Sequence, residues 1–278
     1  MSIEDYSEAD FQKALEIYID YLTWDARSCS CPIAYLTGGQ PGSGKSAFHD
    51  LALSEQKNNL IIIEPDAFRS MHPNYDALVQ KYGKDSVIKT QKFAGFFAEA
   101  LIARLSDSCY NLLIEGTLRT TDVPCKTAEL LRKKGYRVEL LVMAVKPAIS
   151  LVSTIERYER MLNDNPKMAR STPKNHHDQI AANLCSNLGY LYAAALFDEI
   201  RLYNRKLTLL YSSEEAPKKD PSGIIKDIME GAWSADEAKM VRASIQNIYC
   251  LLKNRNAEGT DDWKAIERME NESGVCLT

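Results

Sequence analysis

The chain has 278 residues, of which 45% are hydrophobic and 26% are charged, and its formal net charge is -4. These fractions are typical of a soluble globular protein, so they exclude a disordered or fibrous chain. The basic residues are scattered along an acidic chain, so we expect no nucleic-acid partner. No apolar stretch reaches the length of a membrane span, and the N-terminus carries acidic residues without an apolar signal core. We therefore expect a cytoplasmic protein with no membrane partner.

The elements expected up to residue 145 form a βαβ series. An amphipathic helix at about residues 7–22 lies within an N-terminal segment, 1–30, and would pack on the core or beside a partner. Short apolar runs then alternate with helical patterns. The expected strands are 33–39, 60–64, 111–117 and 136–145. Three helices are expected between them: one that begins at Gly44, a long one that ends near Leu105 and one at about 124–134. Because these strands are apolar on both faces, we predict an α/β fold of three layers with a mainly parallel sheet.

The remaining chain is predicted to close the sheet and then add helices. Residues 147–193 are helical in pattern, except for a polar segment that we interpret as a candidate lid at 163–177. Residues 197–213 resemble one or two closing strands. A polar linker follows at 214–223. We therefore divide the chain into a domain of residues 1–213 and a C-terminal helical extension of residues 214–278.

Residues 39–46 read GQPGSGKS and match the phosphate-binding pattern GxxxxGK[ST], between an expected strand and an expected helix. Backbone N–H groups of such a loop surround phosphate, helped by the positive end of the helix. We expect Lys45 to bridge the β- and γ-phosphates and Ser46 to bind Mg²⁺. The predicted nucleotide-binding residues are Gly39, Gln40, Pro41, Gly42, Ser43, Gly44, Lys45 and Ser46. The pattern predicts a P-loop NTPase-type fold that binds ATP or GTP, and nothing in the sequence separates the two bases.

The other motifs favour a small kinase over the remaining P-loop classes. The guanine-reading NKxD element of regulatory GTPases and the LSGGQ signature of transporter ATPases are both missing. A kinase needs a carboxylate near the γ-phosphate to deprotonate the acceptor hydroxyl. Asp66, just after the second strand, is a candidate base, although its position equally suits a helix cap. Glu64, at the end of the same strand, is a candidate for the surroundings of Mg²⁺.

Two further groups of polar residues are candidates for substrate and transition-state contacts. Glu115, Thr117 and Arg119 follow the third strand together, and they suit either a polyhydroxylated or phosphorylated substrate or a local salt bridge. Positive charge for the transferring phosphoryl group is available from three arginines. They are Arg157 and Arg160 on the helix before the lid and Arg170 in the lid, and spacing alone does not choose among them.

The stretches that carry these residues together resemble the zeta toxin family, the toxin half of epsilon/zeta toxin–antitoxin systems, over roughly residues 30–213. The matching stretches are GGQPGSGKS, EPDAFRSMHPNY, EGTLRTTDVP, TIERYE, ARSTPK with the following HD, and FDEIRLYNRKLTLLYSS. The resemblance implies that residues 1–213 form a P-loop kinase domain. It also implies that the enzyme phosphorylates the 3'-hydroxyl of the amino sugar in UDP-N-acetylglucosamine, which blocks peptidoglycan synthesis.

The resemblance assigns roles residue by residue. It makes Asp66 the general base, gives phosphates and metal to Lys45 and Ser46, assigns the transition state to Arg157 and Arg170, and leaves Arg160 without a main role. The implied sugar-nucleotide contacts are Asp66, Glu99, Glu115, Thr117, Arg119 and Thr127. A family antitoxin occupies the nucleotide site with a helix. The resemblance therefore implies a separate small helical antitoxin as a partner.

The chain departs from the family pattern at two positions. Glu64 stands where the family often has an aspartate, and Leu118 stands where it often has a glycine, which leaves the choice of sugar open. Two other functions therefore remain in view. One is a P-loop kinase of another UDP-sugar or small hydroxyl metabolite, and the other is a nucleotide-dependent binding module without kinase activity.

Overall fold

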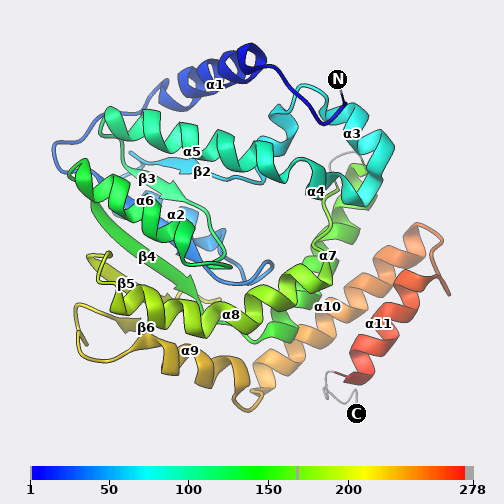
Figure 1. Cartoon of the computed structure of the whole chain (residues 1–278). Coiled ribbons are helices and arrows are strands. Elements are labelled where there is room, and N and C mark those ends of the chain that lie inside the picture. The colour runs from blue at the N-terminus through cyan, green and yellow to red at the C-terminus, as the bar shows by residue number, and fades with distance from the viewer. Residues whose placement is uncertain (1, 167–168, 273–278) are drawn as a thin grey trace.

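The structure is a computed structural model that describes residues 2–166 and 169–272 (Figure 1). The strands are β1 (Ile33–Gly38), β2 (Ile61–Ile63), β3 (Leu112–Ile114), β4 (Arg137–Met143), β5 (Glu199–Tyr203) and β6 (Leu209–Ser212). The longer helices are α1 (Glu8–Thr23), α2 (Ala47–Glu55), α5 (Gln91–Asp107), α6 (Asp122–Lys133), α7 (Pro147–Asp164), α8 (Lys174–Ala193), α9 (Pro221–Glu230), α10 (Ala235–Asn254) and α11 (Asp261–Glu272).

The strands form one six-stranded sheet in the order β2-β3-β1-β4-β5-β6. Every neighbouring pair is parallel except the last, in which β6 runs antiparallel to β5. This confirms the predicted mainly parallel sheet and its closing strands. Strand β1 lies between β3 and β4, so the loop after β1 opens at the centre of the edge where ligands of such sheets bind.

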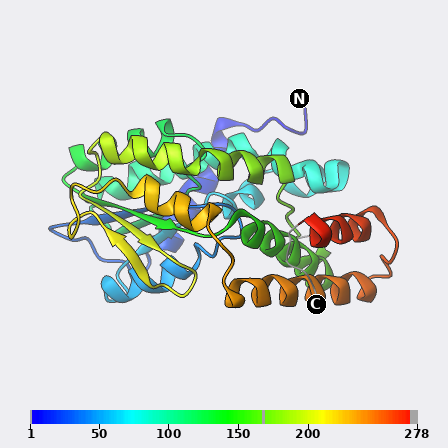
Figure 2. The same cartoon turned by 90° about the horizontal axis from the view of Figure 1, so that it is seen from below.

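Helices cover both faces of the sheet because the buried strands are apolar on both sides. In β4, Val138, Leu140 and Val142 belong to one apolar cluster, whereas Leu141 and Met143 belong to the other, as the alternation of side chains along a strand requires. The first cluster includes residues of α1, α5, α6, α8 and α9. The second includes residues of α2, α7, α10 and α11. Figures 1 and 2 show these three layers, which confirm the predicted architecture.

The prediction of a single long helix ending near Leu105 is confirmed only for its second part, α5, and is wrong for the segment before it. Between β2 and α5 the chain forms a 3₁₀ turn, η1 (Ala67–Met71), then α3 (Tyr75–Tyr82), a second turn η2 (Gly83–Asp85) and α4 (Ser86–Lys89). Pro73 has no backbone N–H to continue a helix. Gly83 has φ +52° at the end of α3, a conformation that stops a helix. Because the helix is interrupted, the residues that follow β2 form a short turn at the edge of the sheet and are not part of a long helix.

The helices after residue 214 pack onto the sheet layers. Ile225 of α9 is buried in the first cluster, and Ile248 of α10 and Ile266 of α11 are buried in the second. Helix α10 lies along α7, with α11 beside it (Figure 1). The predicted lid, 163–177, contains the end of α7 and the start of α8, and its residues 167–168 lie outside the described residues. No helix in the described parts of the chain is both long and apolar enough to cross a membrane.

Candidate active site

The loop between β1 and α2 has the backbone of a phosphate cradle. Gly39, Gly42 and Gly44 have φ values of +129°, +76° and +99°, which residues with a side chain rarely adopt. A Cβ at Gly42 would lie 2.2 Å from the carbonyl oxygen of Ser150 on α7. Glycine is therefore required both by the turn and by the close contact between the loop and α7.

Among the described residues, several polar groups of the cradle have either neutral partners or no hydrogen-bond partner. The ammonium group of Lys45 donates to the carbonyl oxygens of Gly39 and Gln40, at 3.0 Å each, and burial lowers its pKa to about 8. Ser43 Oγ and Gln40 Oε1 are buried without a hydrogen-bond partner in the described chain. Ser46 precedes α2, and its side chain makes no capping hydrogen bond. The ammonium group of Lys45 and the hydroxyl group of Ser43 can donate to a phosphate, and Ser46 offers a hydroxyl ligand to its Mg²⁺.

Asp66 lies three residues after the end of β2, at the N-cap position of η1, but its side chain makes no capping hydrogen bond. Its Oδ1 instead accepts from Arg69 Nε at 2.9 Å and Nη2 at 2.7 Å, and the Asp66 side chain is 73% exposed. Arg170 also donates to the backbone carbonyl oxygen of Asp66. Loss of solvation would raise the pKa of Asp66, but the charges of Arg69, Arg170 and Arg157 hold it below the usual value. The carboxylate is therefore ionised at neutral pH.

The structure separates the two arginines of α7. Arg157 Nη2 donates to Thr172 Oγ1 in the predicted lid at 3.3 Å, and Arg157 interacts electrostatically with Asp66 and Arg170. Arg160 Nη2 pairs with Glu156 one turn back on α7 at 2.6 Å. Of these two arginines, Arg157 is therefore the one whose charge acts on Asp66. Arg157 and Arg170 together place two guanidinium groups near a carboxylate at the mouth of the cradle.

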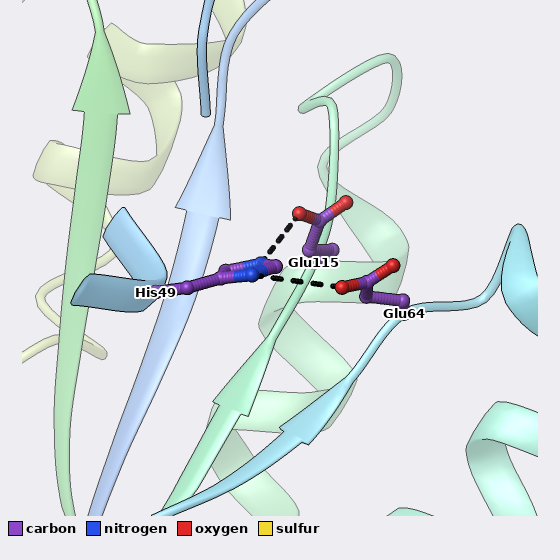
Figure 3. A group of neighbouring side chains, drawn as sticks. All are labelled: His49, Glu64 and Glu115. Carbon is purple, nitrogen blue, oxygen red and sulfur yellow. Dashed lines mark hydrogen bonds and ion pairs between the residues drawn. The ribbon is translucent and has the colours of Figure 1, made fainter. Parts of the chain in front are cut away.

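His49 of α2 connects the ends of two strands (Figure 3). Its Nε2 lies 2.8 Å from Glu115 Oε1, which follows β3, and its Nδ1 lies 3.5 Å from Glu64 Oε1, which follows β2. One ligand atom from each residue lies within 4.8 Å of the others, so the group could also hold a divalent cation. Glu64 and Glu115 are thereby fixed beside the cradle. His49 is one helical turn beyond Ser46, and no sequence pattern indicated it.

This arrangement makes a test by proton titration possible. The hydrogen bond that His49 donates to Glu115 raises the pKa of His49, despite the opposing effect of burial. Burial lowers the pKa of each of the other histidines, which are His72, His176 and His177. Long-range ¹H–¹⁵N spectra should therefore show one imidazole that titrates above the ordinary pKa of about 6.5 and three that titrate below it.

The same spectra should also be recorded for a matched variant, Glu115→Gln, which removes the charge of the carboxylate beside His49. In Glu115→Gln the raised pKa of His49 should fall toward its ordinary value, while the other three histidines stay unchanged. Because the folded pKa is raised, the stability that this contact contributes is present at low pH and is lost as the pH rises through that pKa. A His49 that titrates below the ordinary value in the wild type would show that the contact does not form.

The loop after β3 is held from both sides. Gly116 N donates to Thr37 Oγ1 on β1 at 3.1 Å. Asn187 of α8 donates to the carbonyl oxygens of Leu118 at 2.8 Å and Arg119 at 3.0 Å. This anchoring fixes the loop that carries Thr117 and Arg119, and sequence reasoning did not single out Asn187.

Leu118 has φ +56°, a conformation that favours glycine over residues with a side chain. The side chain is 4% exposed, and its Cδ1 lies 2.4 Å from where a Cβ on Gly38 would be. Burial of leucine against Gly38 offsets the unfavourable backbone conformation. The Leu118 side chain thus fills space beside Gly38 in the core and is not on the surface of the loop.

The two remaining predicted contacts, Glu99 and Thr127, lie on helices α5 and α6. Glu99 is exposed on α5 and makes no hydrogen bond or ion pair with the other candidate site residues, within the described ranges. Thr127 is half-buried on α6. A missed supporting residue is His177, which is fully buried with its Nε2 2.8 Å from Ser150 Oγ. The carbonyl group of Ser150 packs against Gly42 of the loop. His177 therefore stabilises the part of α7 on which the cradle rests.

The strand order, the glycine conformations and the lysine within the loop together define a P-loop protein of the α/β class. The family model described as Zeta toxin matches residues 20–216. The chain belongs to the zeta toxin family.

Individual proteins agree with this assignment. Toxin PezT of Streptococcus pneumoniae serotype 4 (strain ATCC BAA-334 / TIGR4) is 44% identical over 253 residues, which cover 91% of this chain and all of that protein. Toxin zeta of Streptococcus agalactiae is 40% identical over 267 residues, 96% of this chain and 92% of that protein. A solved structure from the PezAT chromosomal toxin–antitoxin system of Streptococcus pneumoniae has a TM-score of 0.83 and 41% identity, and the match covers 91% of this chain and all of that one.

Proposed function

We propose that this protein is a toxin kinase that transfers the γ-phosphate of ATP or GTP to the 3'-hydroxyl of the amino sugar in UDP-N-acetylglucosamine, and so blocks peptidoglycan synthesis. The observation that supports it most is the exposed, ionised carboxylate of Asp66. It lies near the half-buried Lys45 and two further cations, Arg157 and Arg170. A base next to a phosphate cradle is the arrangement that distinguishes a kinase from a hydrolytic switch.

The proposed reaction uses each group once. Asp66 accepts the proton of the sugar hydroxyl as its oxygen bonds to the γ-phosphorus. The bond from the γ-phosphorus to the β–γ bridging oxygen breaks, and the nucleoside diphosphate leaves. Lys45, Arg157 and Arg170 balance the negative charge spread over the transferring group. Ser46 would hold Mg²⁺, which supplies further positive charge at the β- and γ-phosphates when it is bound.

The sugar nucleotide is proposed to lie over the ends of β2 and β3. Glu115 is half-buried there, and its orientation is fixed by His49, which leaves acceptor oxygens for sugar hydroxyl groups. Thr117 and Arg119 lie on the anchored loop beside it, and Thr127 and Glu99 are proposed to contribute at the outer part of the substrate. A carboxylate and a guanidinium side by side suit a ligand that carries both hydroxyl and diphosphate groups.

We further propose a separate antitoxin protein as the partner that restrains this activity. The support comes from the similar solved structure, which belongs to a chromosomal toxin–antitoxin system. Three side chains on the outer face of α1, Ile17, Tyr21 and Trp24, are exposed by 62%, 73% and 87%. Their spacing forms an apolar stripe on one side of the helix, which suits contact with a protein surface.

The acceptor is tested by incubating the protein with ATP, Mg²⁺ and a panel of UDP-sugars, followed by mass spectrometry. We expect UDP-N-acetylglucosamine to gain the mass of one phosphoryl group, with ATP and with GTP compared in parallel. If another UDP-sugar or hydroxyl metabolite gains the phosphate instead, the proposed kinase activity is retained and the proposed acceptor is rejected. Nucleotide binding with no phosphorylated product from any acceptor would favour a binding module.

A further inference from the structure

The short turn that carries Asp66 also carries the cation that pairs with it. Turn η1 has the 3₁₀ conformation, in which side chains three residues apart lie one above the other. Asp66, at its N-cap position, and Arg69 have this spacing. The Arg69 side chain is 15% exposed, whereas that of Asp66 is 73% exposed. The pair therefore has one member inside the protein and one that a substrate can reach.

Arg69 holds only one of the two oxygens of the Asp66 carboxylate. Its Nε and its Nη2 both donate to Oδ1, and within the described ranges no donor reaches Oδ2. A general base must bring a lone pair within hydrogen-bond reach of the proton that it removes. The two contacts to Oδ1 restrict rotation of the carboxylate and leave Oδ2 as the oxygen that can accept this proton.

The third nitrogen of Arg69 fixes the guanidinium to the helices behind the turn. Nη1 donates to the carbonyl oxygen of Val87 on α4, and to Thr90 Oγ1 at the N-cap position of α5 at 3.3 Å. Thr90 is fully buried, and its Oγ1 donates to the carbonyl oxygen of Ser86 at 2.9 Å. The guanidinium thus joins the start of α5 to the carboxylate. Its planar fork supplies donors in fixed directions, which a lysine ammonium group does not reproduce.

The turn itself is held independently by Phe68. This residue is 1% exposed, and its ring centre lies 5.2 Å from that of Phe97 on α5 and 5.3 Å from that of Tyr18 on α1. Packing of buried aromatic rings therefore fixes the backbone of η1 without help from Arg69. Removal of the Arg69 guanidinium should leave the turn in place and free the carboxylate of Asp66 to rotate.

We propose that Arg69 is a positioning residue for phosphoryl transfer, which holds Oδ1 of Asp66 and thereby directs Oδ2 toward the hydroxyl group of the acceptor. The inference rests on the proposed function for the role of Asp66 as the base. Arg69 acts through Asp66 and takes no proton itself. Other charged or titratable groups also act on Asp66 and remain when Arg69 is replaced; in the described chain these are Lys45, Glu64, Arg157, Arg170 and His176.

The test is the pH profile of kcat, with ATP, Mg²⁺ and UDP-N-acetylglucosamine, together with the affinity for ATP measured by calorimetric titration. In Arg69→Met we expect the plateau of kcat near neutral pH to fall on the order of 10²-fold, while ATP affinity changes less than about twofold. Loss of the positive charge raises the pKa of Asp66. The acid limb of the profile, where the base becomes protonated, should therefore move to higher pH.

Two further variants complete this experiment. Arg69→Lys keeps the charge without the fork, so its acid limb should stay near that of the wild type while its plateau falls. It also replaces Arg69→Met if that variant does not fold. Arg104→Met removes an arginine that is exposed on α5, and as the matched control it should change neither the profile nor the affinity.

A double variant separates positioning from a general effect on the fold. Because Arg69 is proposed to act only through Asp66, adding Arg69→Met to Asp66→Asn should slow the reaction by less than about threefold beyond Asp66→Asn alone. A residue with a merely structural role would instead multiply the two losses.

The possible results distinguish this inference from the proposed function. A plateau within about threefold of the wild type in Arg69→Met or Arg69→Lys would overturn the inference and leave the kinase in place. Losses that multiply in the double variant, or a parallel loss of ATP affinity, would do the same. Wild-type protein that phosphorylates no acceptor would remove the proposed function, and the role of Arg69 with it.

Discussion

Asp66→Asn is expected to lower the rate of phosphoryl transfer by about 10²–10⁴-fold while nucleotide affinity is largely kept. Asparagine has nearly the same shape but cannot accept the proton of the acceptor hydroxyl. Arg69, Arg157 and Arg170 hold the pKa of Asp66 below its usual value, so the wild-type base is ionised throughout the neutral range. The rate is measured as formation of phosphorylated UDP-N-acetylglucosamine, and the affinity is measured by titration with ATP.

The matched control is Asp76→Asn, which changes an exposed aspartate in the first turn of α3. It should leave both the rate and the affinity unchanged. The same pair of variants should differ in growing bacteria, because only Asp66→Asn is expected to abolish toxicity on induction. A rate in Asp66→Asn within a factor of ten of the wild type would rule out Asp66 as the general base.

Arg255→Met is expected to reduce the free energy of unfolding by about 3 kcal/mol, the lower end of the range for breaking a buried ion pair, because Arg255 is itself 29% exposed. Arg255 at the end of α10 donates to both carboxylate oxygens of Glu159 on α7, at 2.7 and 3.0 Å, and the Glu159 side chain is 3% exposed. Arg255 also pairs with Asp262 of α11 at 2.8 Å. Methionine keeps most of the stem but leaves the Glu159 charge buried and unpaired.

Urea unfolding followed by circular dichroism measures this loss. Lys253→Met is the matched control, since the pair between Lys253 and Glu258 is exposed and spans 3.9 Å, and it should change stability by less than about 1 kcal/mol. The double variant Glu159→Leu with Arg255→Met should recover much of the loss because the buried charge of Glu159 is removed together with its partner. A double variant as unstable as Arg255→Met would show that Arg255 acts through its other contacts.

Most of the sheet could be predicted from the sequence because buried parallel strands are marked by short apolar runs between helical patterns. The segment after β2 could not, since its helical periodicity concealed two interruptions. Pro73 and Gly83 are the residues that end the local helices there. The C-terminal helices were recognised by their amphipathic pattern, but a pattern cannot say which surface its apolar side meets. The structure shows that α10 meets α7.

The candidate site was predictable where local sequence dictates local geometry. The cradle is one contiguous motif. Glu115 directly follows β3 and Asp66 lies three residues after β2, so their common location follows from the parallel pairing of these strands. The contacts that join separate elements carry no such signal. His49, Asn187 and Arg69 each act across the gap between two elements, over separations that no single-sequence pattern records.

The contact between Gly38 and Leu118 makes these two positions interdependent. A larger residue at position 38 would collide with the leucine, whereas a relative with glycine in place of leucine leaves that volume open. Exchanging the β3–α6 loop between family members therefore alters the packing at the end of the central strand, not only the rim of the substrate opening. Attempts to retarget the enzyme toward other sugars would have to vary both positions in concert.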